Sequence, residues 1–259
     1  MPPRTHLASS PPAAGRTFLL AAGGVVAASV VAVGGLVDGV NENADLSAYD
    51  PGITSSVASL RRTGLTIAAE VASLVGSEVC VAVLSLAALA WLWFVRRDRA
   101  RAVLFAGAMG LGVVLTLAGK HLVERHRPPA GFVVGPVDTG YSFPSGHTLF
   151  STAFLGLVVM LLIWPSAGRR ARVAAVVAAV LASLVIGASR VYLGYHWTTD
   201  VIAAWVLGVA VLTVTLALAS PTMAVATMLL TRLGLDSDAP GVVAPDHDPA
   251  KDGHASPAR

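Results

Sequence analysis

Six long apolar stretches constrain the fold of this chain more than any other feature of its sequence. Each is close to the roughly 20 residues that an α-helix needs to cross the hydrocarbon core of a bilayer. The stretches are Phe18–Val37, Val75–Val95, Ala102–Leu122, His147–Trp164, Val173–Tyr192 and Thr198–Ser220. Only 13% of the 259 residues are charged, against about 25% in an ordinary soluble domain. The sequence therefore predicts an all-α protein, a polytopic membrane helical bundle with six transmembrane helices.

The distribution of charge predicts the orientation of this bundle. The net charge is only +3, and the basic residues gather in short loops such as 96–101 and 169–172, which excludes a nucleic-acid-binding protein. Loops rich in Lys and Arg mark the cytoplasmic side of a membrane. An even number of spans then places both termini in the cytoplasm. Because Arg outnumbers Lys and Ala and Val are abundant, we expect a GC-rich bacterial genome and the cytoplasmic (inner) membrane.

Three regions are expected along the chain. Residues 1–17 are predicted to be a disordered cytoplasmic N-terminus, 18–220 the six-span membrane domain, and 221–259 a largely disordered cytoplasmic tail. The first apolar stretch is longer than the 7–15 residues of a signal-peptide core, so we expect a retained helix. The second stretch is expected to begin near Glu78, with Ser55–Leu74 as a separate helix at the membrane interface.

Three polar clusters stand at the ends of apolar stretches, where hydropathy does not explain them. A charged side chain at the centre of a span costs roughly 2.5–3.5 kcal/mol, so these positions are informative. The clusters are 120–128 after the third stretch, 144–147 at the start of the fourth, and 189–200 between the fifth and sixth. The parity of the spans places all three on the external side. They can therefore form one site.

The residue types in these clusters suit phosphoryl transfer. His196 and Asp200 have the i, i+4 spacing of one helix face, so the carboxylate can hold one ring nitrogen and leave the other free to attack. His147 is predicted to act as general acid and then as general base. Asp200 is also expected to stabilise the positive ring of a phosphohistidine. We therefore predict His196, His147 and Asp200 as the catalytic residues.

A second group of residues is predicted to bind the phosphate. Arg127 and Arg190 offer planar forks and Lys120 a point charge. The backbone N–H groups of Ser145 and Gly146 precede a helix, where anions bind. No cluster of carboxylates with metal-ligand spacing accompanies these residues, so the expected reaction needs no metal and no cofactor.

The remaining polar and aromatic residues near the clusters receive structural interpretations. Glu124 is interpreted as an ion-pair partner of Lys120. Glu78, near the outer membrane surface, is interpreted as a carboxylate at a helix end, with contact to a lipid head group as the alternative. Tyr192, Tyr195 and Trp197 are interpreted as interfacial aromatics. No role is assigned to His121, Arg125 and His126.

The order Lys-x6-Arg-Pro, Pro-Ser-Gly-His and Ser-Arg-x5-His-x3-Asp resembles the three signature motifs of the type 2 phosphatidic acid phosphatase superfamily. Lys120, Arg127 and Pro128 match the first motif, residues 144–147 the second, and Ser189, Arg190, His196 and Asp200 the third. The resemblance covers about residues 65–220. It implies the same roles for these residues as the chemistry above.

The combined prediction is an integral membrane lipid phosphatase that works through a phosphohistidine without metal. Its partners are a lipid phosphate, which enters sideways from the outer leaflet, and membrane lipids. The leading substrate is a polyprenyl (undecaprenyl-type) diphosphate, and phosphatidylglycerophosphate and phosphatidic acid are the alternatives. A phosphotransferase would share every residue. A vanadium haloperoxidase, also found in the superfamily, fits poorly with six spans, and a non-catalytic lipid binder or transporter has no need of both histidines.

Overall fold

The computed structural model describes the backbone of residues 13–232 and the side chains of residues 17–219. Within this part of the chain, six helices are long and apolar enough to cross a membrane. They are α1 (Ala13–Glu42), α4 (Glu78–Ala90), α5 (Arg99–Val123), α6 (Gly146–Leu157), α7 (Arg169–Tyr192) and α8 (Thr198–Arg232). Single π-helical segments, Trp91–Val95 and Val158–Ile163, extend α4 and α6. The predicted all-α bundle with six membrane-crossing helices is confirmed.

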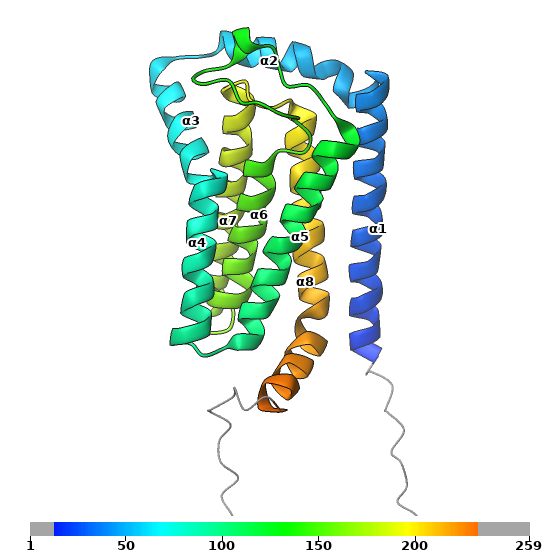
Figure 1. Ribbon diagram of the computed structural model, residues 1–259, viewed down its shortest axis with the longest axis vertical. Helices are drawn as coiled ribbons and strands as arrows, with labels where there is room; N and C mark the ends of the chain where they lie inside the picture. Colours follow the sequence, from blue (N-terminus) through cyan, green and yellow to red (C-terminus); the bar gives the residue numbers. More distant parts are fainter. Residues whose placement is uncertain (1–12, 233–259) are drawn as a thin grey trace, which may run out of the picture.

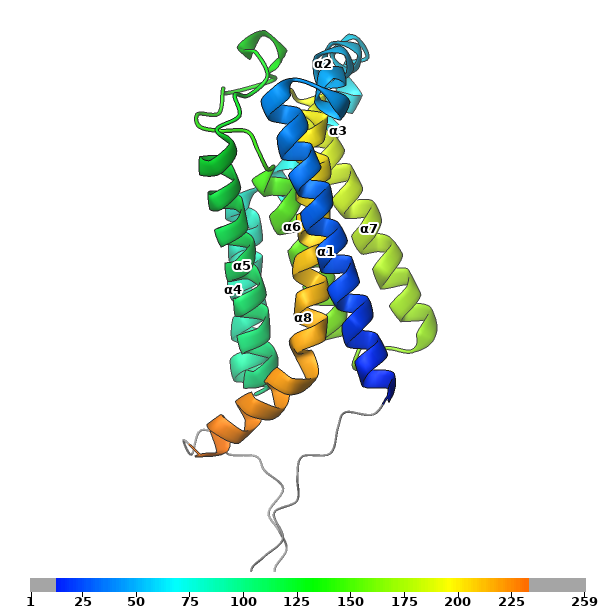
Figure 2. The same cartoon turned by 90° about the vertical axis from the view of Figure 1, so that its right-hand side faces the viewer.

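The bundle is organised around α6, which packs against α5, α7 and α8. A buried apolar core joins α5, α6 and α8 and includes Phe105, Leu157 and Val211. On the outside, α1 packs against α8. Figures 1 and 2 show that α1 begins and α8 ends at the same end of the bundle, where the Arg-rich loops 96–101 and 169–172 also lie.

The first and last helices extend beyond the predicted apolar stretches. α1 begins at Ala13, inside the segment predicted to be disordered, and α8 continues to Arg232 rather than ending at Ser220. The helical backbone therefore continues past the apolar part of α8, Thr198–Ala219, that is suited to a membrane. The predictions for residues 1–12 and 233–259 lie outside the described residues.

The segment between α1 and α4 forms two helices, α2 (Asp50–Ser59) and α3 (Thr63–Val75), after a short 3-10 helix, η1 (Asp45–Tyr49). α2 lies across the end of the bundle, whereas α3 runs along the bundle above α4 (Figure 1) and packs against α7. The prediction of one interfacial helix over Ser55–Leu74 is therefore wrong. The break falls at Arg61, whose guanidinium donates to the carbonyl oxygens of Tyr192 and Phe132 at 2.6–3.0 Å.

The start of α4 agrees with the sequence. Glu78 lies in the first turn, and the Ser77 hydroxyl caps the helix by accepting from the Cys80 N–H at 3.2 Å. This break between α3 and α4 places Glu78 at the same depth as the first turn of α6, a position that bears on the site described below.

Candidate active site

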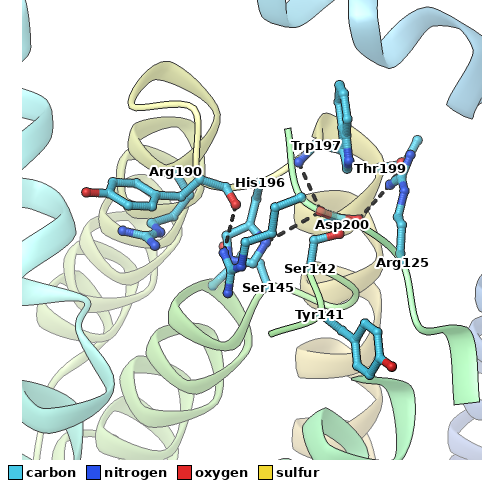
Figure 3. Close-up of polar contacts among 12 residues, drawn as sticks. Arg125, Tyr141, Ser142, Ser145, Arg190, His196, Trp197, Thr199 and Asp200 are labelled. Atoms are coloured by element: carbon cyan, nitrogen blue, oxygen red, sulfur yellow. Dashed lines mark hydrogen bonds and ion pairs between the residues drawn. The ribbon is translucent and has the colours of Figure 1, made fainter. Parts of the chain in front are cut away.

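The three polar clusters meet at one end of the bundle, opposite the Arg-rich loops (Figure 3). The end of α5 and the loop after it carry Lys120, Arg125 and Arg127. The first turn of α6 carries Gly146 and His147. The remaining members are Arg190 in the last turn of α7, His196 in the turn between α7 and α8, and Asp200 in the first turn of α8. Three segments that are far apart in sequence thus supply one constellation.

His196 lies at the centre of this constellation and is 2% exposed. Its Nδ1 is 3.4 Å from Asp200 Oδ2, a close contact without the alignment of a hydrogen bond. Its Nε2 is 3.4 Å from Nη1 of Arg127, on the side of the arginines that are predicted to bind the phosphate. Burial lowers the pKa of His196 to about 4, and neighbouring Asp200 only partly offsets this. The ring is therefore neutral at pH 7, and its Nε2 can carry the lone pair of a nucleophile.

The geometry of the His196–Asp200 pair differs from the expected helix face. α8 begins at Thr198, so His196 precedes the helix. The two meet because the Asp200 carboxylate folds back toward the start of the helix, where its Oδ2 accepts from the Trp197 N–H at 2.9 Å. This is the arrangement of a capping box, in which the third helical residue binds the N–H of the cap.

Arg190 and Arg127 are both held in place by protein groups. Arg190 is buried, donates from Nη1 to the Ser73 hydroxyl at 2.6 Å, and stacks over the Tyr195 ring at 4.1 Å. Arg127 donates from Nη1 to the Tyr195 carbonyl at 2.8 Å and from Nε to the Gly140 carbonyl at 3.2 Å. These contacts fix the two guanidinium planes before any ligand binds.

The two guanidinium groups converge on one carboxylate oxygen. Oδ2 of Asp138, from the loop between α5 and α6, is 3.4 Å from Arg127 Nη1 and 3.2 Å from Arg190 Nη2. The Asp138 side chain is 44% exposed. Two arginine forks on one anionic oxygen provide the charge that the equatorial oxygens of a transferring phosphoryl group require.

Tyr195 was interpreted from sequence as an interfacial aromatic, and the structure gives it a different position. Its ring supports Arg190, and its hydroxyl donates to the Val134 carbonyl at 2.9 Å. Burial raises the pKa of Tyr195, which keeps this hydroxyl protonated. Trp197 likewise packs within the protein, with the Arg125 guanidinium 5.5 Å from its ring centre.

A further carboxylate, that of Glu78 in the first turn of α4, lies against the first turn of α6. A Cβ added to Gly146 would overlap the Glu78 carboxylate, so Glu78 reaches from α4 to the N-terminus of α6. It also lies near enough to Lys120 for their charges to interact. Lys120 itself donates to the Tyr141 carbonyl at 2.8 Å. Glu78 is therefore part of the site and not only a carboxylate at a helix end.

Ser145 differs in part from the prediction. Its N–H donates to the Asp200 carbonyl at 3.2 Å, so this N–H does not face an anion, and its hydroxyl accepts from Thr148 at 3.0 Å. The first N–H groups of a helix have no partner within the helix. The N–H groups of Gly146 and His147 are therefore the backbone donors that can bind an anion here. The assignment of Ser145 to phosphate binding stays a prediction.

His147 occupies the first turn of α6 and is half-buried. The side chains whose charges act on it are Arg190, His196, Arg127 and Lys120. It thus lies among the predicted phosphate-binding residues, on a different helix from His196. The catalytic roles of His147, His196 and Asp200 remain predictions from chemistry.

Two residues without an assigned role complete the constellation. Arg125 donates to Asp200 Oδ1 at 2.6 Å and to Asp50 Oδ2 at 2.7 Å. Arg125 stands inside the first motif, but nothing in its spacing distinguishes it from a variable position. Asp50 precedes Pro51, and a proline at this position indicates the start of a helix. This pattern does not indicate that the Asp50 side chain is buried. Within residues 13–232, no group of three or more His, Cys, Asp or Glu side chains is arranged to hold a metal ion.

The family model of the PAP2 superfamily matches residues 101–224, which contain all three clusters. These residues, just under half of the chain, belong to the PAP2 superfamily. Curated relatives of this chain include an undecaprenyl-diphosphatase of Sulfolobus acidocaldarius, 33% identical over 123 residues, which are 46% of this chain and 55% of that one. Phosphatidylglycerophosphatase B of Bacillus subtilis is 35% identical over 91 residues, 34% of this chain and 43% of that one. The chain thus spans about half the length of these curated relatives.

The fold of this chain is also found in a solved structure. The crystal structure of a transmembrane PAP2-type phosphatidylglycerolphosphate phosphatase from Bacillus subtilis superposes with a TM-score of 0.67 at 22% identity. The superposition covers 76% of this chain and 96% of that one. At this identity the likeness shows a shared fold.

Proposed function

We propose that this protein is a membrane lipid phosphatase that transfers a phosphoryl group to His196 and then to water. The observation that carries the proposal is the position of the neutral His196 ring, whose Nε2 faces the fork of Arg127 beside that of Arg190. A nucleophile next to two fixed cationic forks is the arrangement that phosphoryl transfer uses.

The chemistry follows in two steps. In the first, the Nε2 lone pair attacks phosphorus, the bond from phosphorus to the leaving oxygen breaks, and His147 gives its proton to that oxygen. In the second, His147 takes a proton from water, the water oxygen attacks phosphorus, and the bond from phosphorus to Nε2 breaks. Asp200 stabilises the positive ring that exists between the two steps, and Arg127 and Arg190 hold the phosphoryl oxygens.

A groove beside the site supports a lipid as the substrate. It lies between α4 and α5, has a volume of about 490 Å³, and has Glu78 and Lys120 among its lining residues. The rest of the lining is mostly apolar and includes Val81, Met109 and Val113. A long apolar chain can lie in this groove while its phosphate reaches Lys120. This supports sideways entry of the substrate from the lipid bilayer.

The substrate and the orientation are part of the same proposal. A polyprenyl diphosphate is the leading substrate, and the undecaprenyl-diphosphatase among the relatives supports this choice. Phosphatidylglycerophosphate is the second candidate, supported by the phosphatidylglycerophosphatase B relative. The Arg-rich loops at the far end of the bundle support a site on the external side of the cytoplasmic membrane, with both termini in the cytoplasm.

The decisive experiment measures phosphate release by detergent-purified protein in excess EDTA. The substrates are polyprenyl diphosphate, phosphatidylglycerophosphate and phosphatidic acid. We expect release by the wild type, loss of release in His196→Ala, and full release in the control His121→Ala, which changes an exposed histidine at the end of α5. The relative rates select the substrate.

Two results would contradict the proposal. Folded wild-type protein that releases no phosphate from any of the three lipids would favour a phosphotransferase that needs an acceptor. Release that stops when EDTA is added would contradict the metal-free reaction. Brief incubation with lipid labelled in its terminal phosphate, followed by an alkaline quench, should leave label on the wild type and none on His196→Ala.

A further inference from the structure

A buried acid–arginine pair lies behind the predicted nucleophile and has no part in the two steps above. Asp50 opens α2 and is 1% exposed, and the Arg125 side chain is 11% exposed. Asp50 also lies outside residues 101–224, the region that matches the family model. Arg125 and Arg127 are two residues apart but differ in surroundings, since Arg127 faces His196 whereas Arg125 faces Asp200 and Asp50.

The contacts of this pair form a closed network around the first turn of α8. Arg125 Nη1 donates to Asp200 Oδ1 at 2.6 Å and to the Thr199 hydroxyl at 2.7 Å, while Nη2 donates to Asp50 Oδ2 at 2.7 Å. Asp50 closes the network by accepting from the Thr199 hydroxyl at 2.5 Å and from the Thr199 N–H at 3.2 Å. Both Nη groups of Arg125 are thereby engaged within the protein.

The network assigns a separate partner to each oxygen of the Asp200 carboxylate. Oδ1 is held by Arg125, and Oδ2 is shared between the Trp197 N–H and the His196 ring. Figure 3 shows Arg125 and His196 on opposite sides of Asp200. Because Oδ1 is anchored, the carboxylate cannot rotate freely, and Oδ2 stays 3.4 Å from Nδ1 of the ring. The negative charge of this nearby oxygen favours the ring form with its proton on Nδ1, which leaves the lone pair on Nε2.

The formal charges of the network also suit the proposed reaction. Two carboxylates and one guanidinium leave one net negative charge beside His196, which becomes cationic when it is phosphorylated. The Asp50 carboxylate neutralises the positive charge of the buried Arg125. Without Asp50, Arg125 would neutralise Asp200, whose negative charge stabilises the phosphorylated ring. A buried charge without a partner is costly, so each member of the network depends on the others.

We propose that Arg125 and Asp50 are positioning residues that orient the Asp200 carboxylate and, through it, the His196 ring. The inference rests on the proposed function of His196 as the nucleophile. It extends the functional unit to α2, so that a segment outside the matched region contributes to the rate of phosphoryl transfer. A residue of this kind changes turnover and leaves substrate binding nearly unchanged.

The test compares kcat and KM for phosphate release by the variants Arg125→Lys and Asp50→Asn. A lysine cannot contact both carboxylates as the planar fork does, and asparagine keeps the shape of Asp50 without its charge. We expect kcat to fall at least tenfold in Arg125→Lys and several-fold in Asp50→Asn. KM and the inhibition constant of inorganic phosphate should stay within about threefold of wild type. The double variant should turn over no more slowly than Arg125→Lys alone, because the two residues act through one contact.

Matched controls come from the opposite end of α5. Arg101 pairs with Asp98 at 3.1 Å, so Arg101→Lys and Asp98→Asn make the same chemical changes far from the site. We expect both to keep kcat within twofold of wild type. Thermal unfolding of every variant separates a loss of folded protein from a loss of turnover.

A second readout does not depend on turnover. In protein labelled with ¹⁵N-histidine, with the His196 signals assigned from His196→Gln, the wild-type ring should be in the form protonated at Nδ1. Arg125→Lys should shift the ring toward a mixture of the two neutral forms. If the wild type released no phosphate, the proposed function would fail, and this signal would still decide the positioning role.

Three results would overturn the inference. The first is a kcat within twofold of wild type in folded Arg125→Lys. The second is a rise in KM and in the phosphate inhibition constant at constant kcat, which would make Arg125 a substrate-binding residue. The third is a lower unfolding temperature with unchanged turnover and an unchanged ring signal, which would make the network purely structural.

Discussion

Replacing Asp138 by asparagine should strengthen phosphate binding. The Asp138 carboxylate occupies the point where the forks of Arg127 and Arg190 converge, at 3.4 and 3.2 Å. A phosphate that binds here must displace the Asp138 carboxylate from the two guanidinium groups. Because Asp138 is 44% exposed, each ion pair is worth only about 0.2–1 kcal/mol, or about 1 kcal/mol for the two together. Asparagine removes this competition and keeps the size of the side chain.

A free-energy change of about 1 kcal/mol corresponds to roughly a fivefold change in affinity. Isothermal titration of Asp138→Asn with inorganic phosphate should therefore give a dissociation constant roughly fivefold lower than that of wild type. The difference should shrink at high salt, because exposed ion pairs are screened. Asp98→Asn, at the far end of the bundle, is the matched control and should bind as wild type. Weaker binding by Asp138→Asn would refute the reasoning and show that Asp138 instead aligns the arginines for the phosphate.

Three other substitutions test separate parts of the site. Gly146→Ala should lower kcat/KM at least tenfold, because the added Cβ would overlap the Glu78 carboxylate at the N-terminus of α6; wild-type kcat/KM would contradict this packing. Arg190→Lys should lose at least nine-tenths of the activity at normal expression, because a point charge cannot bind two phosphoryl oxygens; near wild-type turnover would remove Arg190 from the phosphate site. The buried neutral His196 has a pKa of about 4 when folded and about 6.5 when unfolded. The unfolded chain therefore binds more protons between these values, and wild-type stability should fall by up to about 3 kcal/mol relative to His196→Gln as the pH falls from 7 to 4. If the unfolding temperatures of the two proteins changed equally with pH over this range, the result would contradict the buried neutral ring.

The sequence was a good guide to the elements and to the end of the bundle where the polar clusters lie. Hydropathy over about 20 residues is a local property, so the six spans could be found without tertiary information. The predicted span Thr198–Ser220 agrees with the apolar part of α8, whereas hydropathy did not indicate that the helix continues to Arg232. The prediction of one helix over Ser55–Leu74 was wrong because the break at Arg61 depends on the carbonyl groups of Phe132 and Tyr192. Both residues are far from Arg61 in the sequence.

The sequence by itself determined the class of fold, the parity that brings the three clusters to one face, and the residue types suited to binding and attacking a phosphate. Only the tertiary structure decided which charges meet. Asp50 and Arg125 are 75 positions apart, and Asp138 carries no local signal that distinguishes it from a solvated acid. The sequence placed Glu78 at the start of a span but did not place it against Gly146. Their contacts depend on how α2, α4 and the loop before α6 pack over the site. An ion pair is set by distance in space, which spacing along the chain reports only within a single helix or turn.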